Sequence, residues 1–278
     1  MAKMVTSRTT STTLGFAASI WRRTNDHNVF GAAAELAYFF MLALFPMLIF
    51  LTSLVSSFSG ARQSILGALS RVMPGDAMGI VRAALDDAIS NRSGGLISIG
   101  ILGTIWAASA GVSALNSTLN TVFDVKETRP YWRVKGIAIA LTLALSVLVV
   151  IGILLVMFGD RFGTWAAGRL HLGGFLTVGL AVLDYVVGFG FLLAGLEVAY
   201  YFGPNKKRQW RWVTPGAFVA VAAVLIVSIM FSIYLRFAPS YSATYGSLGA
   251  FVVLMIWLYL MSLVIMLGAE IDSQREET

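Results

Sequence analysis

The residues of this 278-residue chain that could do chemistry are a few carboxylates and amides set inside apolar segments. Asp184 is the clearest case, because it lies about ten residues into a long apolar stretch, too deep for its short side chain to reach water. Ionisable residues at such depth are costly and usually face a bundle interior or a wet cavity. Two roles follow: a neutral Asp hydrogen-bonded to a neighbouring helix, or a member of a polar pathway.

Three glutamates, Glu35, Glu197 and Glu270, lie near the ends of apolar segments. Each carboxylate could simply reach interfacial water or a basic loop, and Glu35 also gains from the positive end of its own helix. The alternative for Glu35 and Glu197 is a place in the same polar pathway as Asp184.

A stripe of polar residues occupies one face of another apolar segment. Ser109, Ser113, Asn116 and Asn120 are spaced by four, three and four residues, which places them on one side of a helix. Such a stripe commonly joins helices through hydrogen bonds, and it could equally line a cleft. With the topology predicted below, the two amides lie toward the same leaflet as Glu35 and Glu197, which favours a polar cavity open to the cytoplasmic side.

Several kinds of catalytic centre are excluded by the residue types. The chain has no cysteine and two histidines, His27 and His171, so disulfides, iron–sulfur clusters and Cys/His zinc sites are ruled out. A metal site would need carboxylates alone, and Walker-type phosphate loops are absent. We predict no metal and no cofactor.

The composition indicates the setting of these residues. Hydrophobic residues make up 58% of the chain and charged residues 12%, whereas soluble domains carry about 25% charged residues. Six apolar stretches are each long enough to cross a hydrocarbon core of about 30 Å. We therefore predict an all-α membrane domain over residues 32–270. The six predicted spans are 32–58, 95–123, 136–158, 174–202, 213–237 and 247–269.

The orientation follows from the basic residues, because Lys and Arg are enriched in cytoplasmic loops. Thirteen of the twenty lie on the side that holds both termini. This predicts a multi-pass protein of the bacterial inner membrane with cytoplasmic segments at 1–31 and 271–278. The net charge of +6 is explained by this asymmetry, so we expect no nucleic-acid partner.

Residues 61–92, between the first two spans, are too polar to cross a membrane. Their apolar residues repeat at helical spacing against charged ones, and Pro74 and Gly75 divide the segment into two short amphipathic helices. These helices could lie in the outer interface or cap the bundle, or pack on the protein's own spans.

Pro46 lies near the middle of the first span. It removes one backbone hydrogen bond and crowds the carbonyl group of Leu42, so a kink is expected there. We regard Pro46 as a candidate hinge.

A cationic loop follows the fourth span, which Gly203, Pro204 and Asn205 should end. Lys and Arg beside interfacial Trp suit anionic headgroups of the inner leaflet, and they also suit a plain positive-inside anchor. Tyr245, in the outer loop before the last span, could meet a headgroup or form part of a helix cap. The candidate headgroup contacts are Lys206, Lys207, Arg208, Arg211 and Tyr245.

Four segments resemble the YihY/BrkB family of bacterial inner-membrane proteins. They are AYFFMLALFPMLIF in the first span, RPYW at 129–132, AYYFGPNKKRQWRWVTPGA from Ala199 and TYGSLGAFVVLMIWLYLMSLVIMLGAEID from Thr244. The resemblance implies six spans with cytoplasmic termini, in agreement with the count above. Some members have carried the label ribonuclease BN, but this chain has neither a histidine-rich metal motif nor an acidic cluster in a soluble loop for phosphodiester cleavage.

These observations favour a non-enzymatic protein that transports or flips a lipid or other amphiphilic envelope component. The alternative is a membrane scaffold or envelope-assembly factor whose polar residues are structural. Membrane lipids are the expected partners, and a second copy of the chain or an envelope protein stays open.

Overall fold

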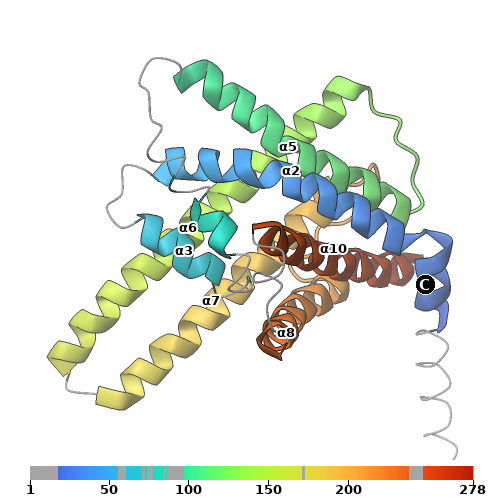
Figure 1. The fold of residues 1–278 in the computed structure, drawn as a ribbon. Helices are drawn as coiled ribbons and strands as arrows, with labels where there is room; N and C mark the ends of the chain where they lie inside the picture. The colour runs from blue at the N-terminus through green and yellow to red at the C-terminus, as the bar shows by residue number, and fades with distance from the viewer. Residues whose placement is uncertain are drawn as a thin grey trace, which may run out of the picture.

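The computed structural model describes residues 18–55, 61–70, 73, 78–83, 86, 97–170, 173–237 and 247–277, and within them it contains helices and no strand. Six long helices dominate (Figure 1), and each overlaps one predicted span, which confirms the helical-bundle fold class. The long helices are α2 (Val29–Val55), α5 (Ile97–Val122), α6 (Tyr131–Leu170), α7 (Gly173–Phe202), α8 (Pro215–Phe237) and α10 (Ser247–Glu277). A shorter helix, α3, covers Ala61–Ser70.

Among the described residues, four of these helices hold a stretch that is long and apolar enough to cross a membrane. The four stretches are Val29–Leu48, Tyr131–Gly152, Pro215–Leu235 and Gly249–Glu276, and Val186–Phe202 is a shorter apolar helix. Helix α5 is outside this set. The fold is therefore that of a helical membrane bundle, and six spans stay a prediction.

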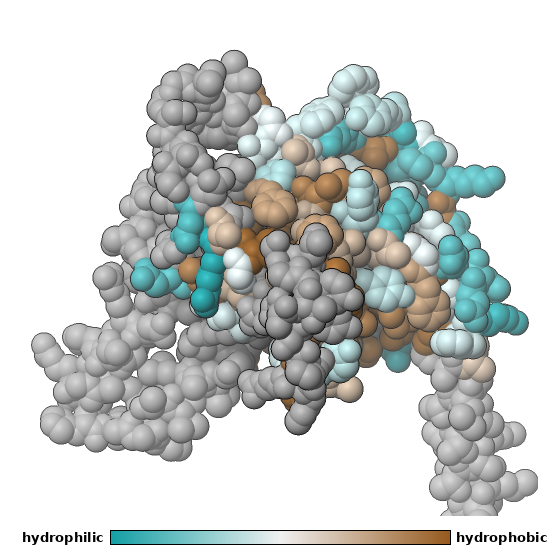
Figure 2. All heavy atoms as spheres, viewed as in Figure 1, coloured by the Kyte–Doolittle hydropathy of each residue, from teal (hydrophilic) through white to brown (hydrophobic). Residues whose placement is uncertain are grey.

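The helices pack as an interlocked group with one projecting hairpin. Helix α2 packs against α5 and α10, α10 packs against α8, and α6 contacts both α7 and α5. In Figure 1, α6 and α7 run side by side away from the other helices. Figure 2 shows hydrophobic residues across the middle of the visible face and hydrophilic ones along the side where the C-terminus lies in Figure 1.

Two groups of buried apolar side chains form the core. One joins α2, α8 and α10 through residues such as Leu48, Phe231 and Trp257, and the other joins α2, α5, α7 and α10. Met73 and Val81, from the predicted amphipathic segment, are buried in the first group. The described part of that segment therefore packs on the protein's own helices.

Helix α2 continues without interruption through Pro46, from Val29 to Val55. The role of Pro46 as a hinge stays a hypothesis.

The described parts of the two predicted cytoplasmic segments are largely helical. Residues 18–26 are helical, and α10 runs past the predicted end of its span to Glu277. The two segments contact each other, because Ser19 bonds Gln274 and Arg23 bonds Ser273. The apolar pattern gave no sign of this helical continuation, since the polar residues involved face protein rather than water.

Candidate functional site

Most of the polar contacts lie at one end of the bundle, which we call the polar end. It comprises residues 19–29, 116–135, 197–217 and 265–277. These are the start of α2, the end of α5, the start of α6, the end of α7, the start of α8 and the end of α10. The alternation of helix starts and ends is the one that the predicted topology requires at its cytoplasmic side.

The end of α5 is set by Asp124, whose φ is +51°. Among the described non-glycine residues, Asn28 also has a positive φ, of 46°. The N–H of Val125 donates to the Asn120 carbonyl group and that of Asp124 to the Thr121 carbonyl group, at 2.9 and 3.1 Å. This is the Schellman arrangement, with Asp at the position usually held by Gly. It turns the chain sharply and leaves the Asp124 carboxylate facing the N-terminal helix.

A first polar cluster surrounds Glu270, which is fully buried. Its two carboxylate oxygens contact Arg23 Nε at 3.2 Å and His27 Nδ1 at 2.5 Å. The same two side chains also contact Asp124, at 3.4 Å from Arg23 Nη2 and 3.3 Å from His27 Nε2. This cluster ties the N-terminal helix to α10 and to the end of α5, and it gives both oxygens of the buried Glu270 a partner.

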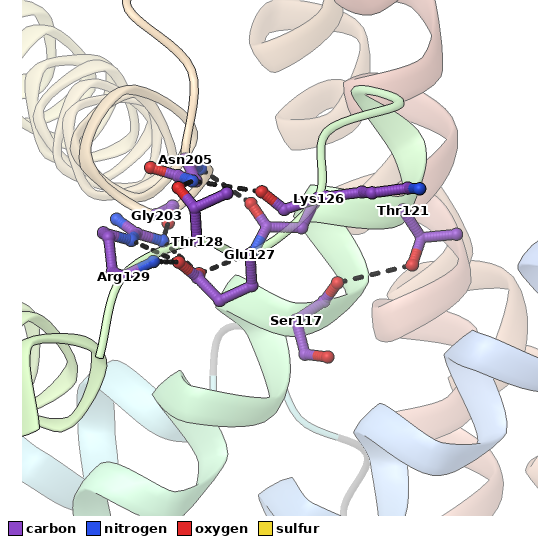
Figure 3. Close-up of polar contacts among 9 residues, drawn as sticks. Ser117, Thr121, Lys126, Glu127, Thr128, Arg129, Gly203 and Asn205 are labelled. Carbon is purple, nitrogen blue, oxygen red and sulfur yellow. Dashed lines mark hydrogen bonds and ion pairs between the residues drawn. The ribbon is translucent and has the colours of Figure 1, made fainter. Parts of the chain in front are cut away.

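A second cluster joins two loops across the polar end through Asn120. Its Nδ2 donates to Glu127 at 2.9 Å, and its Oδ1 accepts from the backbone N–H of Asn205 at 2.7 Å. Asn205 in turn donates through Nδ2 to the carbonyl group of Lys126 and to the hydroxyl group of Thr128 (Figure 3). The nitrogen of the Asn120 amide thus holds the loop after α5, and its oxygen holds the loop after α7.

Arg129 completes this junction. Its guanidinium group bonds Glu127 twice, at 2.8 and 2.6 Å, and donates to the carbonyl group of Gly203 at 3.0 Å (Figure 3). The bidentate Arg129 contact lowers the pKa of Glu127 to about 2, against a smaller opposing effect of burial. The ion pair therefore holds the loop after α5 against the end of α7.

A third cluster caps the N-terminus of α8. Thr214 acts as the N-cap, because its Oγ1 accepts from the N–H of Ala217 at 3.3 Å, and Pro215 occupies the first helical position. Glu197 accepts from the N–H of Thr214, and Asp272 Oδ1 accepts from the N–H of Gly216 at 2.7 Å. Two carboxylates from α7 and α10 thus serve the free N–H groups of α8, where the helix dipole favours negative charge.

Glycines bring α8 and α10 together at this cap. A Cβ atom at Gly216 would lie 2.1 Å from the carbonyl oxygen of Gly268 and 2.5 Å from Asp272 Cγ. A Cβ atom at Gly268 would lie 2.7 Å from the carbonyl oxygen of Gly216. The two backbones approach so closely that only Gly fits at both positions, as small residues commonly permit in membrane helices.

The cationic loop divides into paired and exposed residues. Lys206 Nζ lies 3.2 Å and Arg208 Nε 2.5 Å from the Glu276 carboxylate, and Arg208 also lies over the Phe123 ring. Lys207 and Arg211 are exposed, and so is Trp212, at 82%. Two of the four cations therefore hold the loop on α10, and the other two face outward beside a tryptophan.

Of the other predicted pathway residues, Asn116 and Glu35 have described side chains. Asn116 is 1% exposed, and neither atom of its amide has a hydrogen-bond partner in the described structure. Glu35 lies on an exposed face of α2. The side chain of Asp184 and the residue Tyr245 lie outside the described part of the chain, so their predicted roles stay predictions.

The two serines of the polar stripe of α5 form hydrogen bonds to backbone carbonyl groups of the same helix. The Ser109 hydroxyl donates to the carbonyl group of Trp106, and the Ser113 hydroxyl donates to that of Ser109. Of the stripe, Asn120 bridges to other segments. The contacts therefore favour the structural interpretation for the two serines.

Sequence reasoning missed Asp272, Arg23 and Glu276 as partners at the polar end. Asp272 and Glu276 fall after the last apolar stretch, so they read as a solvated tail. A signal was available, because no Gly or Pro follows Gly268, so no local residue type ends the helix at the predicted boundary of the span. Within the described residues no group of three or more His, Asp or Glu side chains is arranged to hold a metal ion.

The long apolar helices and the polar end define a multi-pass helical membrane protein. The chain belongs to the family described as Virulence factor BrkB, which it matches over residues 20–278. It is 36% identical over 260 residues to the ribonuclease-like protein YfkH of Bacillus subtilis (strain 168), an alignment that covers 94% of each chain.

Two further relatives carry names that describe only a membrane protein. A UPF0761 membrane protein of Alteromonas mediterranea is 28% identical over 256 residues, which are 90% of this chain and 83% of that protein. A UPF0761 membrane protein of Alkalilimnicola ehrlichii is 29% identical over 251 residues, which are 86% of this chain and 53% of the longer relative. No solved structure matches this chain.

Proposed function

We propose that this protein transports or flips an amphiphilic envelope component, an anionic lipid, at the bacterial inner membrane. Both termini face the cytoplasm in this proposal, and the protein is not an enzyme. The ribonuclease-like name of the relative YfkH describes that protein. The residues of this chain offer no cysteine and no phosphate-binding loop, so we base the proposal on binding rather than on catalysis.

The observation that carries the proposal is the division of the cationic loop. Lys206 and Arg208 anchor the loop to Glu276, whereas Lys207 and Arg211 are exposed and the exposed Trp212 follows Arg211 in the chain. Exposed cations next to an exposed tryptophan suit an anionic headgroup at the depth of the membrane interface. The loop therefore makes first contact with the lipid in this proposal.

A second aromatic group lies at the start of α6. Tyr131 and Trp132 are 62% and 74% exposed, and Lys135 lies over the ring of Trp106 at 4.5 Å. Exposed aromatic rings of this kind are enriched at membrane interfaces, which supports a position of the polar end at the headgroup level. In the proposal, the carboxylates behind the loop handle protons or cations, because acidic groups alone would repel an anionic headgroup.

Lipid association tests the role of the loop. In detergent solution, the variant with Lys207→Gln and Arg211→Gln should bind added anionic lipid more weakly than the wild type, by about 1 kcal/mol for each cation. The difference should shrink as salt is added. The matched control is Lys206→Gln with Arg208→Gln. It should lower the thermal stability of the protein and change its lipid binding less than the first variant does. Equal binding of all three proteins would overturn the headgroup role.

The alternative is a scaffold that transports nothing. The observation that favours it is the pairing at the polar end, where Glu197, Asn120 and Glu270 all hold neighbouring segments in place. A scaffold would keep these contacts in every state. It would bind lipid at the interface without moving it between leaflets.

A further inference from the structure

One of the two oxygens of the Asp272 carboxyl group is hydrogen-bonded in the fold, and the other is not. The side chain is 3% exposed, and its Oδ1 accepts the N–H of Gly216 at 2.7 Å. Its Oδ2 is buried without a hydrogen-bond partner in the described structure. An ionised oxygen in that position would be held away from water, which is costly for a carboxyl group, and the nearby Thr214 hydroxyl group offsets this cost only in part.

The groups that face this carboxyl come from three segments. Glu197 and Tyr200 belong to α7, Thr214 and Arg208 to the segment before α8, and Glu276 to α10 itself. Arg208 is the one cation among them, and it is already bonded to Glu276 and to the carbonyl group of Tyr200. Glu197 is itself 4% exposed and adds a second negative group nearby.

The packing around Asp272 decides what it can bind. A Cβ atom placed on Gly216 would lie 2.6 Å from Asp272 Oδ1, and one on Gly268 would lie 2.9 Å from the Tyr200 hydroxyl group. A hydrated metal ion needs several oxygen ligands and the room to hold them. The close approach of α8 and α10 leaves space for a proton rather than for such an ion.

We propose that Asp272 is a proton-binding site, neutral while α8 is docked on α10, with the proton on Oδ2. Protonation turns the carboxylate into a carboxylic acid and consumes one proton, and Oδ1 keeps its bond to the Gly216 N–H. Movement of α8 away from α10 exposes the group to water, where it ionises and releases that proton. Docking of the two helices and proton binding are therefore linked.

The proton-binding site is inferred from the contacts of Asp272 alone, whereas its role in transport rests on the proposed function. In that function, proton release at the polar end would accompany the helix movement that opens a path for the lipid. Proton binding to the docked state gives the movement a direction under a proton gradient.

Infrared spectroscopy of the full-length purified protein at neutral pH tests the site without any transport assay. The wild type should show the C=O band of a protonated carboxyl group that shifts in deuterated water. Asp272→Asn should lose this band, and Asp272→Glu should displace it, which covers the case in which the Asn variant does not accumulate. Glu127→Gln is the control and should retain the band, because the Glu127 carboxyl group belongs to a different cluster and its pair with Arg129 keeps it ionised at neutral pH.

Two outcomes would overturn the proposal. One is a wild-type spectrum with no protonated carboxyl band, since Asp272 would then be ionised while docked. The other is a band that survives in the Asp272 variants and disappears in Asp184→Asn. A band that depends on Asp272 supports the proton site even where vesicles containing the protein move no lipid, so the two proposals fail separately.

Discussion

Buried carboxylates at the polar end bond mainly to backbone N–H groups and cations of other segments. Glu197 and Asp272 hold the N-terminus of α8, and Glu270 holds Arg23 and His27. The sequence predicts that Glu197 and Glu270 reach water or a basic loop, or that Glu197 lines a pathway, and it does not single out Asp272. At the residue scale, the packing of these side chains and their charge can be tested separately.

Gly216→Ala should destabilise the protein, because the added methyl group would meet the Gly268 carbonyl oxygen and the Asp272 carboxyl group. Overpacking of this kind costs about 1 to 3 kcal/mol. Thermal unfolding of the purified protein measures the effect. The control is Gly136→Ala in α6, where a Cβ atom meets nothing within 4 Å and helix propensity should raise stability by up to about 1 kcal/mol. Equal stability of the two variants would contradict the close approach of α8 and α10.

Glu127→Gln should lower stability near neutral pH, because it removes the ion pair with Arg129. The pKa of Glu127 is about 2 in the folded protein against an ordinary value of 4.5. A carboxylate whose folded pKa is depressed stabilises the fold above pH 4.5, and that contribution is lost as the pH falls toward 2. The expected loss is about 1 kcal/mol, since the side chain is partly exposed.

The difference between Glu127→Gln and the wild type should therefore shrink in acid. Thermal unfolding at a series of pH values measures it. A constant difference across that range would show that the amide change acts through packing rather than through charge.

At the scale of the elements, the sequence predicted which segments form helices but not how their ends are held. Apolar length and periodicity located all six long helices, because both properties depend on neighbouring residues alone. The turn at Gly203 and Pro204 was likewise predictable from local residue types. The bonds of Asn120 to Asn205 and of Asp272 to Gly216 join residues far apart in the chain, and no local pattern specifies such partners.

The element ends also define a topology test, for which the chain is suited because it lacks cysteine. A cysteine at Gln209, exposed in the cationic loop, should react with an impermeant thiol reagent only after the inner membrane is opened. A cysteine at Ser70, exposed at the end of α3, should react in intact spheroplasts. Ser273 is unsuitable because it is fully buried and bonded to Arg23.

The reverse labelling pattern would overturn the predicted orientation. Labelling of both positions in intact cells would contradict the alternation of helix ends at the polar end. Either result would also move the cationic loop away from the inner leaflet.

At the scale of the whole molecule, the polar end holds most of the charged residues in the described part of the chain. The exposed side chains of the described helices are largely hydrophobic, as expected of surfaces that face lipid (Figure 2). The loops at the polar end are tied together by Arg129 and Arg208, so opening of a path there requires those contacts to break. Lipid movement would therefore require rearrangement of the polar end of the bundle.

The central claim is that this protein moves an amphiphile between leaflets, and lipid exchange in reconstituted vesicles tests it most directly. Labelled anionic lipid should leave the outer leaflet faster with the wild type than in protein-free vesicles, under an imposed proton gradient. Lys207→Gln with Arg211→Gln should slow that exchange while the protein stays folded. Wild-type vesicles that exchange labelled lipid no faster than protein-free ones would contradict the claim and leave the scaffold as the better account.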